Sequence, residues 1–355
     1  MIEFKTLSTI TQHEYDLFVK ECEFSSFFHS VKYKTLLNSI LIDATEMYLL
    51  FYSENQLIAA LPLFKKNGRN GVVFNSLPFF GSHGGLLYKN KINDVTLNQI
   101  ATVVINLLTE NNYNFFTAVE PLFSPNNSFY DGLLASVEQK RIGQITYLPS
   151  SKSKFDINSD LLQYFPGKRR WDIKKGLNQG FRIFHSGEES YFLELFNLHV
   201  ENMQMINGTA KPKIMFEKIP EIFQYDLDYR LYIAEYDSKV VAALLIFFFK
   251  DQVEYFLPVI HKDFRSYQPL SALIYTAMAD SIKDKESKVW NWGGTWATQD
   301  TLYRFKKSWN AHDKEYRYHI KTNLSSTVLR GINFKEAILE FQNFYLYPVS
   351  EEYYD

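Results

Sequence analysis

The stretch YLLFYSENQLIAALPLFKK, from Tyr48 to Lys66, has the pattern of a strand, a polar turn and a second strand. A similar stretch, YIAEYDSKVVAALLIFFFKD, runs from Tyr232 to Asp251 and has the same Ala-Ala-Leu at its centre. A helical pattern precedes each stretch, and an extended piece, a helix and a further strand follow it. We therefore predict two copies of one α–β-hairpin–β–α–β unit in tandem.

The flanking elements of the two copies occur in the same order. Apolar residues at spacings of three and four predict the helices, and short apolar runs predict the strands. In the first copy these elements are Glu14–Ile40, Val95–Glu110 and Tyr113–Val119, and in the second copy they are Glu188–Met205, Pro269–Lys283 and Lys288–Trp292.

A polar stretch at residues 148–153 has the composition of a linker between the two copies. We expect domains over residues 1–148 and 149–322. Residues 323–355 are expected to form a C-terminal helix and tail, with an amphipathic helix at Ile332–Phe344 that packs on the first domain.

Composition excludes several classes of protein. A formal net charge of −2 does not favour a nucleic-acid-binding surface over the whole molecule, and the single cysteine, Cys22, excludes an internal disulfide. The apolar run Val240–Phe249 is about half as long as the roughly 20 residues of a membrane-spanning helix. The start of the chain is polar, so we expect a cytoplasmic protein. No pair of histidines has helical ligand spacing, so we expect no metal site.

Several short stretches, together with the order of elements, resemble one family. The chain is similar to the FemABX-type peptidoglycan-bridge aminoacyltransferases and the related BioF2-like acyltransferases, which are tandem GNAT proteins. The stretches that carry this resemblance are Phe28-His29-Ser30 with Lys32-Tyr33, the basic segment Lys168–Gly176, the strand exit Asn291–Thr295 and the Phe-Lys segment Leu302–Trp309.

The resemblance implies a fold and an activity. The fold is expected to be α/β with mixed sheets, in two tandem GNAT-like (acyl-CoA N-acyltransferase fold) domains, with the active site in the second. The expected activity is an N-acyltransferase that moves an aminoacyl or acyl group to an amine on a cell-wall or surface-glycan precursor. The acceptor would be a small molecule or a sugar nucleotide.

The donor would be either aminoacyl-tRNA or acyl-CoA, with no tightly bound cofactor. Two departures from related proteins bear on this choice. We find no long helical-hairpin insertion of the kind that some members use to grip tRNA. The segment His261–Gln268 takes the place of the glycine-rich loop of acyl-CoA-binding GNAT proteins, and it contains no glycine.

Lys306 is the first candidate catalytic residue. Leu302, Phe305 and Trp309 fall at helical spacing and predict one packed face, with Lys306 at its edge. The family resemblance implies that Lys306 stabilises the negative charge that develops when an amine attacks a carbonyl. The adjacent Phe305 is also a candidate catalytic residue. The alternative is that Lys306 is a surface lysine.

Tyr255 is the other candidate catalytic residue. It lies in a predicted strand beside Lys288–Trp292, and GNAT folds separate these two strands and place the acyl carbonyl in the gap. Tyr255 would be a ligand or an acid there, or else a core residue. Residue spacing does not identify a general base.

Other residues are candidates for substrate binding, each with an alternative as a core or surface residue. Arginine and lysine in the basic segment suit phosphate, a glycine-rich turn around His83 suits close approach of a ligand, and residues at a helix start suit an anion. The full set is His29, Lys32, Tyr33, His83, Arg169, Arg170, Lys174, Tyr267, Gln268, Asn291 and Arg304.

Two other functions are consistent with the sequence. The chain would be a non-catalytic binding module for a sugar nucleotide or a partner protein if both copies had lost activity. It would bind RNA through the segment Lys168–Lys175, which holds five basic residues and one acidic residue.

Overall fold

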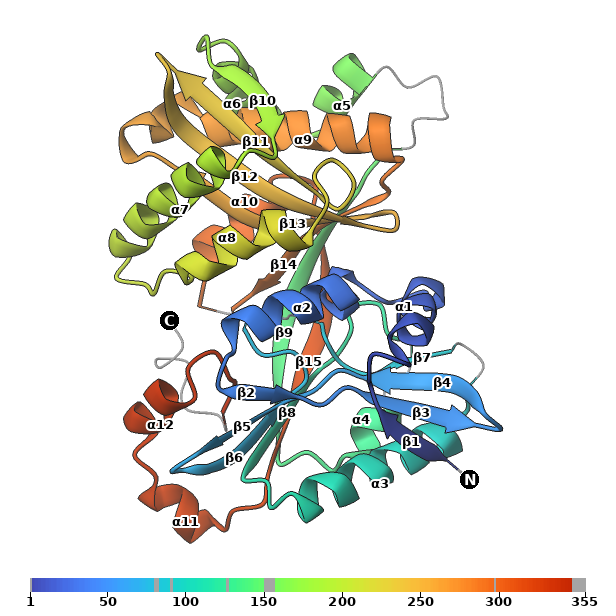
Figure 1. The fold of residues 1–355 in the computed structure, drawn as a ribbon. Helices are drawn as coiled ribbons and strands as arrows, with labels where there is room; N and C mark the ends of the chain where they lie inside the picture. The colour runs from blue at the N-terminus through green and yellow to red at the C-terminus, as the bar shows by residue number, and fades with distance from the viewer. Residues whose placement is uncertain are drawn as a thin grey trace. The chain divides into compact units, whose positions relative to one another are not determined.

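The computed structural model describes residues 2–79, 83–89, 92–125, 128–149, 157–296 and 298–346. It divides into two compact units (Figure 1), one of residues 1–141 with 315–355 and one of residues 142–314. Part of the expected linker, residues 150–153, and Gly81 of the expected glycine-rich turn lie outside the described residues. The expected domain boundaries stay a prediction.

The first unit contains two groups of paired strands. One is a sheet in the order β1-β3-β4-β7, and the other has the order β15-β8-β6-β5-β2, in which only β6 and β8 run parallel. Its helices and strands are β1 (Glu3–Thr6), α1 (Gln12–Glu21), η1 (Phe27–His29), α2 (Val31–Ile40), β2 (Ala44–Glu46), β3 (Leu49–Ser53), β4 (Gln56–Leu61), β5 (Phe64–Gly68), β6 (Gly71–Asn75), β7 (Leu87–Tyr88), α3 (Asp94–Glu110), β8 (Phe115–Val119), α4 (Ser128–Gly132), α11 (Ser326–Gly331) and α12 (Phe334–Glu340).

The second unit holds six paired strands in the order β10-β11-β12-β13-β14-β9. Strands β9 (Val137–Tyr147) and β15 (His312–Thr322) each have one end in each unit. The other elements of this unit are α5 (Ile157–Tyr164), α6 (Gly167–Leu177), β10 (Arg182–Ser186), α7 (Glu189–Gln204), α8 (Lys213–Ile222), β11 (Tyr229–Tyr236), β12 (Lys239–Phe249), β13 (Gln252–Ile260), η2 (Lys262–Tyr267), α9 (Pro269–Lys285), β14 (Val289–Thr295) and α10 (Asp300–Lys307).

The predicted hairpins and the helix that follows each are present in both units, with local differences. The first apolar run does not continue as one strand, because Pro62 separates β4 from β5 and the two strands enter different sheets. The second run forms one long strand, β12, that is buried along most of its length. The pattern Glu14–Ile40 is divided into α1, η1 and α2, where Ser30 caps α2 by accepting a hydrogen bond from the backbone N–H of Tyr33.

Helices cover both faces of the sheet in the second unit. Figure 1 shows α9 crossing one face and α7 and α8 on the other. On the α9 face, Leu273, Ala277 and Met278 pack on alternate residues of β12. On the other face, the ring of Phe223 lies 4.9 Å from the ring of Phe247. A strand covered on both faces must be apolar throughout, and β12 has that composition.

Strand β13 loses its neighbour part of the way along its length. It pairs in parallel with β14 only from Gln252 to Glu254, opposite Val289 to Asn291, and then continues alone on that side to Ile260. Its pairing with β12 shifts by one residue at the same point, which leaves Phe256 as an extra residue. A bulge of this kind bends a strand and redirects its side chains. The two strands therefore separate immediately after Glu254.

The first unit has a parallel pair of the same kind, but another segment of the chain is bonded to it. Val73 to Asn75 pair with Phe115 to Thr117, so Asn75 takes the position of Glu254. The Asn75 side chain donates to the backbone oxygen of Tyr345 at 3.0 Å and accepts from its N–H at 2.5 Å. The C-terminal segment thus occupies the end of this strand pair, which carries no carboxylate at the corresponding position.

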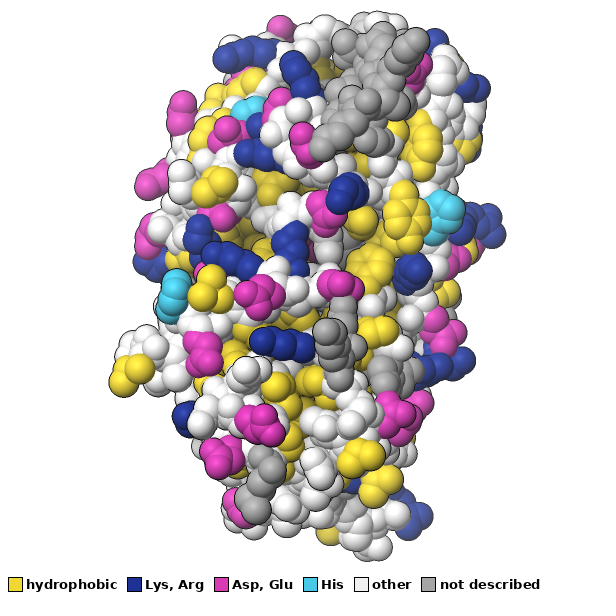
Figure 2. Space-filling model, turned by 90° about the vertical axis from the view of Figure 1, so that its right-hand side faces the viewer, with side chains coloured by type: hydrophobic (Ala, Val, Ile, Leu, Met, Phe, Trp, Pro, Cys, Tyr) yellow, Lys and Arg dark blue, Asp and Glu magenta, His cyan; other side chains and the backbone are white. Residues whose placement is uncertain are grey.

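Two features of the surface bear on the expected partners. No helix among the described residues has both the length and the apolar composition needed to cross a membrane. Acidic and basic side chains are intermingled over the face of the protein seen in Figure 2, so this face offers no continuous basic area to a polyanion.

Close packing of α6 against the start of α9 generates a stability prediction. A Cβ atom at Gly176 would overlap the backbone oxygen of Gln268 and come within 3.0 Å of Ala272. We expect Gly176→Ala to lower the free energy of unfolding by about 1–3 kcal/mol, because neither the backbone at the start of α9 nor helix α6 can move away freely. Urea denaturation followed by tryptophan fluorescence measures this change.

Gly167→Ala, on the same helix, is the matched control. The nearest atom to a Cβ at Gly167 is the Nη2 of Arg170 at 3.7 Å, so this variant should unfold at the same urea concentration or a higher one. Equal midpoints of urea denaturation for the two variants would contradict the close packing of α6 against the start of α9.

Candidate active site

Lys306 is buried, although it lies on a short and largely exposed helix. It is 3% exposed and is the one residue of α10 that is fully buried. The helix starts at Asp300 after the turn that ends β14, and the buried ring of Trp309 anchors its far end. Leu302, which we expected on the packed face, is 39% exposed instead, so the packed face is narrower than the spacing predicted.

The ammonium group of Lys306 is held against the exit of β14. Its Nζ donates to the backbone oxygen of Gly294 at 2.9 Å and to Oγ1 of Thr295 at 2.8 Å, with a longer contact of 3.4 Å to the oxygen of Gly293. Thr295 in turn donates to Oε1 of Gln144 at 3.1 Å. Two short bonds fix the position of Nζ, and its third N–H is only weakly used.

A buried carboxylate on β13 lies close to this lysine. Glu254 is 7% exposed, and its Oε2 accepts a hydrogen bond of 2.7 Å from Nδ2 of Asn291. The other side-chain atom of Asn291, Oδ1, accepts from the N–H of Gly293 at 3.0 Å. Asn291 therefore connects the carboxylate of one separated strand to the turn at the end of the other.

The electrostatics of this pair are unusual. Burial raises the pKa of Glu254 to about 8, although Asn291 and the charge on Lys306 act in the opposite direction. Burial also lowers the pKa of Lys306 to about 8, opposed by the charge on Glu254. Both groups therefore titrate near neutral pH, where proton transfer by side chains is most effective.

Open space adjoins the carboxylate. Gly293 has a φ of +71°, a conformation that favours glycine. A Cβ atom placed there would have only one neighbour within 4 Å, the Oε1 of Glu254 at 4.0 Å. The space that a side chain at Gly293 would occupy therefore adjoins Oε1 of Glu254.

Tyr255 and Phe305 lie together on the opposite face of the sheet from Glu254. The rings of both contact Trp292, at 4.8 Å and 6.1 Å between centroids, within the core under α9. Burial raises the pKa of Tyr255. The structure thus places Tyr255 and Phe305 beside the gap between β13 and β14, and separates them from the carboxylate.

The basic segment forms helix α6, whose residues have different surroundings. Arg169 is buried, donates to Oγ of Ser308 and Ser271, and lies over the ring of Trp309, so its contacts are those of a structural residue. Arg170 donates to Gln163, and Lys174 is exposed. A phosphate-binding role for this set remains a prediction, and the hydrogen bonds and ion pair of Arg169 are made with Ser271, Ser308 and Asp172.

Candidates in the first unit are mostly buried. His29 contacts Ser26 and the backbone oxygen of Gly85, and Tyr33 donates to the backbone oxygen of Phe79 at 2.9 Å. The ring of His83 lies 4.4 Å from that of Tyr316 and is 1% exposed. Lys32 is partly exposed. For the three buried residues, the observed contacts are internal, and a role in binding remains a prediction without support from these contacts.

The remaining candidates lie in the second unit, outside the Glu254–Lys306 pair. Arg304 is exposed and paired with Asp300 at 2.8 Å. Gln268 precedes α9, and its Oε1 accepts from Ser271 at 2.9 Å. Tyr267 is 46% exposed and lines a cavity. The structure therefore brings together Lys306 and Asn291 from the predicted set, with Glu254 as a residue that the sequence reasoning did not identify.

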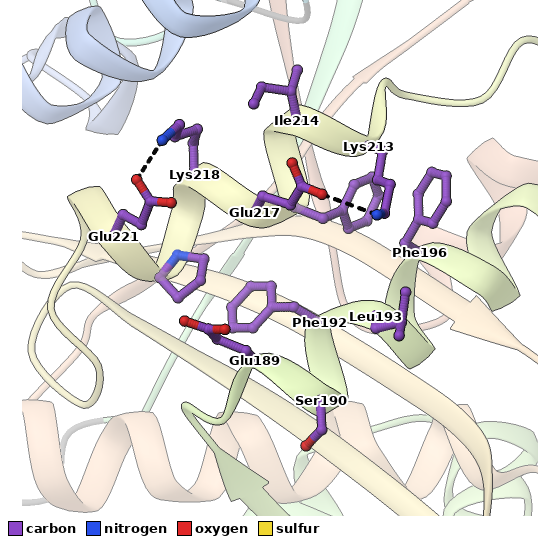
Figure 3. Close-up of a pocket in the computed structure, with 12 residues that line it drawn as sticks. Glu189, Ser190, Phe192, Leu193, Phe196, Lys213, Ile214, Glu217, Lys218 and Glu221 are labelled. Carbon is purple, nitrogen blue, oxygen red and sulfur yellow. Dashed lines mark hydrogen bonds and ion pairs between the residues drawn. The ribbon is translucent and has the colours of Figure 1, made fainter.

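A groove between α7 and α8, of about 450 Å³, lies apart from the residues named above (Figure 3). Phe192 and Phe196 lie on the α7 side, and ion pairs within α8 border it, at 3.1 Å for Lys213–Glu217 and 2.5 Å for Lys218–Glu221. Among the described side chains, no group of three or more His, Cys, Asp and Glu is arranged to hold a metal ion.

Comparison with known proteins relates this geometry to a family. Residues 168–317 match the family model described as an acetyltransferase (GNAT) domain. Three solved structures resemble the chain over most of its length. FemX shows 13% identity and a TM-score of 0.70, with 93% of this chain and 99% of that chain covered. A search of curated protein sequences gives no match.

The other two resemble it less closely in fold. A tandem GNAT protein from the clavulanic acid biosynthesis pathway shows 10% identity, a TM-score of 0.56 and coverage of 92% and 100%. The C-terminal domain of a putative lysylphosphatidylglycerol synthetase from Agrobacterium fabrum shows 12% identity, a TM-score of 0.54 and coverage of 96% and 100%. At these identities the likeness establishes the fold, and it confirms the expected two GNAT-like domains.

The coupling of Glu254 and Lys306 generates a prediction that does not depend on a substrate. Because the ammonium charge lowers the pKa of the carboxyl group, Lys306→Met should raise the pKa of Glu254 above its value of about 8. A pH titration of ¹³C-labelled glutamate side chains by NMR, with Glu254→Gln to assign the signal, measures this shift. A Glu254 signal that titrates near pH 4.5 in the unmodified protein would contradict the described site.

Proposed function

We propose that the chain transfers an acyl or aminoacyl group to an amine on a cell-wall or surface-glycan precursor. Residues 168–317 match the family model of an acetyltransferase (GNAT) domain, and the fold resembles those of FemX and of a tandem GNAT protein, which supports acyl transfer. The observation that carries this proposal is the buried pair of Glu254 and Lys306 beside open space, at the point where β13 and β14 separate.

The reaction requires two chemical functions from the protein. The nitrogen of a neutral amine attacks the carbonyl carbon of an activated acyl group, a C–N bond forms, and negative charge develops on the carbonyl oxygen. The C–S or C–O bond to the leaving group then breaks, and the attacking nitrogen loses a proton. The site must accept that proton and stabilise the oxygen charge.

Glu254 is the proposed general base. Its Oε1 faces the open space beside Gly293, while Oε2 is held by Asn291, so the group is oriented with one oxygen available. A carboxylate in water is too weak a base to deprotonate an amine efficiently near neutral pH. The raised pKa of Glu254 brings it into the range where it accepts a proton and returns it to the leaving group.

Lys306 is the proposed electrostatic stabiliser. Thr295 and Gly294 fix its ammonium group before any substrate arrives, so no reorganisation is needed as charge develops on the carbonyl oxygen. Asn291 is a positioning residue, since it touches Glu254 and the Gly293 turn through its two amide atoms.

A non-catalytic binding module is the second candidate function. Two features favour the enzyme over it. A buried carboxylate and a buried ammonium group with pKa values displaced toward neutrality are costly to maintain, and a surface that only recognises a ligand has no need of them. Binding of a sugar nucleotide without transfer from any activated acyl donor would instead support the module.

The pH dependence of transfer provides one test of the proposal. Glu254 acts in its ionised form, so kcat/KM should rise as the pH increases toward about 8, and it should fall above about 8 as Lys306 loses its proton. The two limbs belong to the coupled pair. Glu254→Gln should lower kcat about 100- to 10,000-fold and remove the part of the rising limb centred near pH 8.

The amine of the acceptor also titrates, and it contributes a rising limb to the pH profiles of both the unmodified protein and Glu254→Gln. The diagnostic quantity is therefore the difference between the two profiles, measured by mass spectrometry of the acylated product. Identical profiles and rates for the unmodified protein and Glu254→Gln would exclude Glu254 as the base.

Lys306→Ala provides a second test, with its neighbour as the matched control. Removal of a placed donor to an oxyanion costs about 3 kcal/mol, so kcat should fall about 100-fold or more. Lys307 is 41% exposed at its side chain and pairs with Asp313 at 3.4 Å, so Lys307→Ala should retain activity within about twofold. Circular dichroism establishes that both variants are folded, and comparable losses in the two would argue against the role given to Lys306.

A further inference from the structure

Strand β9 carries two buried polar side chains that contact β14, the strand beside the active site. Gln144 and Thr146 are both 0% exposed and lie two residues apart, so they point to the same side of the sheet. Thr146 accepts from Nε1 of Trp292 and donates to the backbone oxygen of Trp309, both at 2.9 Å. It thus joins β14 to the end of α10. Gln144 makes the corresponding connection close to Lys306.

The amide of Gln144 is bonded at both ends. Its Oε1 accepts from the hydroxyl of Thr295 at 3.1 Å, and its Nε2 donates to the backbone oxygen of Tyr303 at 3.3 Å and to Oδ1 of Asp313 at 3.4 Å. The two atoms beside Nε2 are both acceptors, which assigns the NH₂ group to that end and the carbonyl oxygen to the Thr295 end. An oriented amide therefore connects β14 with α10 and the start of β15.

Gln144 also lies opposite the irregular part of β14. The two residues between Asn291 and Gly294 are opposite the single Gln144 of β9. A bulge of this kind interrupts the regular ladder. The backbone oxygens of Gly293 and Gly294, at this point, accept from Nζ of Lys306. Gln144 is therefore the β9 residue beside the segment of β14 that holds the lysine.

The hydroxyl of Thr295 acts as an acceptor toward Lys306. An ammonium group donates hydrogen bonds and cannot accept them, and Nζ lies 2.8 Å from Oγ1. The hydroxyl hydrogen is directed instead to Oε1 of Gln144. Without Oε1, that hydrogen would be able to turn toward Nζ, an arrangement that suits a neutral amine and opposes an ammonium ion. Gln144 thus favours the charged form of Lys306 in a fixed position.

The charged groups on neighbouring elements do not replace this contact. Burial lowers the pKa of Lys306 to about 8, and Glu254 on β13 opposes that decrease. Arg169 on α6 has an ion pair within its own helix, and Lys307 is paired with Asp313. The hydrogen bonds of Nζ that the structure describes are with neutral oxygen atoms, so the orientation of those atoms decides how well the charge is held.

We propose that Gln144 is a positioning residue, which acts through Thr295 to hold the ammonium group of Lys306 in place for transfer. This inference rests on the proposed function and adds to it a residue from a strand outside the gap between β13 and β14. Gln144 is fully buried and contacts Thr295, so its effect on the reaction passes through Lys306. The effect is therefore expected in kcat and in the pH profile, and not in KM.

Gln144→Met tests the proposal, because methionine has a similar length and lacks the amide. The pKa of Lys306 should fall by about 1 from its value of about 8, since the hydroxyl of Thr295 is no longer fixed as an acceptor. Lys306 acts in its charged form, so the high-pH decrease of kcat/KM should move to lower pH by the same amount. We also expect kcat to fall about tenfold and KM to stay within about twofold.

Two measurements report these effects. A pH titration of ¹³C-labelled lysine side chains by NMR, with Lys306→Met to assign the signal, gives the pKa of Lys306 without any substrate. Mass spectrometry of the acylated product gives the pH profile of transfer. An unchanged pKa of Lys306 in folded Gln144→Met would overturn the proposal.

Thr146→Val is the matched control. Thr146 is equally buried on the same face of β9, and its hydrogen bonds are with Trp292 and Trp309. Valine keeps its shape and removes both bonds, so Thr146→Val and Gln144→Met should each unfold at a lower urea concentration than the unmodified protein. The pKa of Lys306 should change only in Gln144→Met. Equal changes in the two variants would show that Gln144 has a structural role alone.

Gln144→Glu separates the two ends of the side chain, and it keeps the test available if Gln144→Met does not fold. It retains an oxygen that faces Thr295 and removes the donor at the other end. The pKa of Lys306 should therefore stay at about 8 or rise, although the variant is less stable. A decrease of this pKa in Gln144→Glu would overturn the proposal.

Thr295→Val and Thr295→Ser test the connection itself. Valine removes the hydroxyl and should lower the pKa of Lys306 at least as far as Gln144→Met does, whereas serine keeps the hydroxyl and should restore it. Gln144→Met should add nothing in the presence of Thr295→Val, because both changes break the same chain of hydrogen bonds. Additive effects on the pKa of Lys306 would mean that Gln144 acts by another route, and would overturn the proposal.

Failure of this inference is distinguishable from failure of the proposed function. A lowered pKa of Lys306 in Gln144→Met, with no transfer by the unmodified protein from any activated acyl donor, would retain the connection to Lys306 and reject the acyltransferase. Transfer by the unmodified protein, with the same rate and pH profile in Gln144→Met, would retain the acyltransferase and reject the positioning role.

Discussion

The separation of β13 from β14 after Glu254 is the constraint on which the second unit depends. An internal strand that loses its neighbour leaves backbone groups unpaired, and proteins accept this cost chiefly at functional sites. Here the bulge at Phe256, the left-handed Gly293 and the amide of Asn291 act together to keep the two strand ends apart but fixed. The buried carboxylate and ammonium group then have a defined separation that neither strand alone could impose.

The two units have diverged at equivalent positions. The parallel pair β6–β8 of the first unit carries Asn75 where β13–β14 carries Glu254. The side-chain amide of Asn75 is hydrogen-bonded to the backbone of Tyr345. An amide suits that place, because it can donate to a carbonyl and accept from an N–H at once, which a carboxylate cannot. The same scaffold therefore serves internal packing in one unit and candidate chemistry in the other.

Much of the fold was predictable from the sequence, because long apolar periodicity reports directly on helices and buried strands. The hairpins, α3, α7 and α9 are present as predicted, and the family match and structural neighbours confirm the GNAT-like expectation. The division of the helical pattern at Glu14–Ile40 depends on tertiary packing. The break at Pro62 depends on the backbone N–H that proline lacks. These features have weak signals in a periodicity analysis.

The candidate site was only partly predictable, because its key contacts join residues far apart in the chain. Lys306 and Asn291 were identified through a family resemblance. Glu254 was missed, although a signal existed: it is an acidic residue inside a strand whose neighbours Val253, Tyr255 and Phe256 are all apolar. Burial of His29 and Tyr33 could not be foreseen, since their partners are backbone atoms of Gly85 and Phe79.

The C-terminal segment has a consequence for the order in which the protein is built. The second unit is continuous in sequence, from residue 142 to residue 314, whereas the first unit also contains residues 315–346. Strand β15 pairs with β8, Glu340 bonds Asn70, and Tyr345 bonds Asn75. During synthesis on the ribosome, the first unit can therefore be completed only after residues 315–346 have emerged, whereas all residues of the second unit emerge before them.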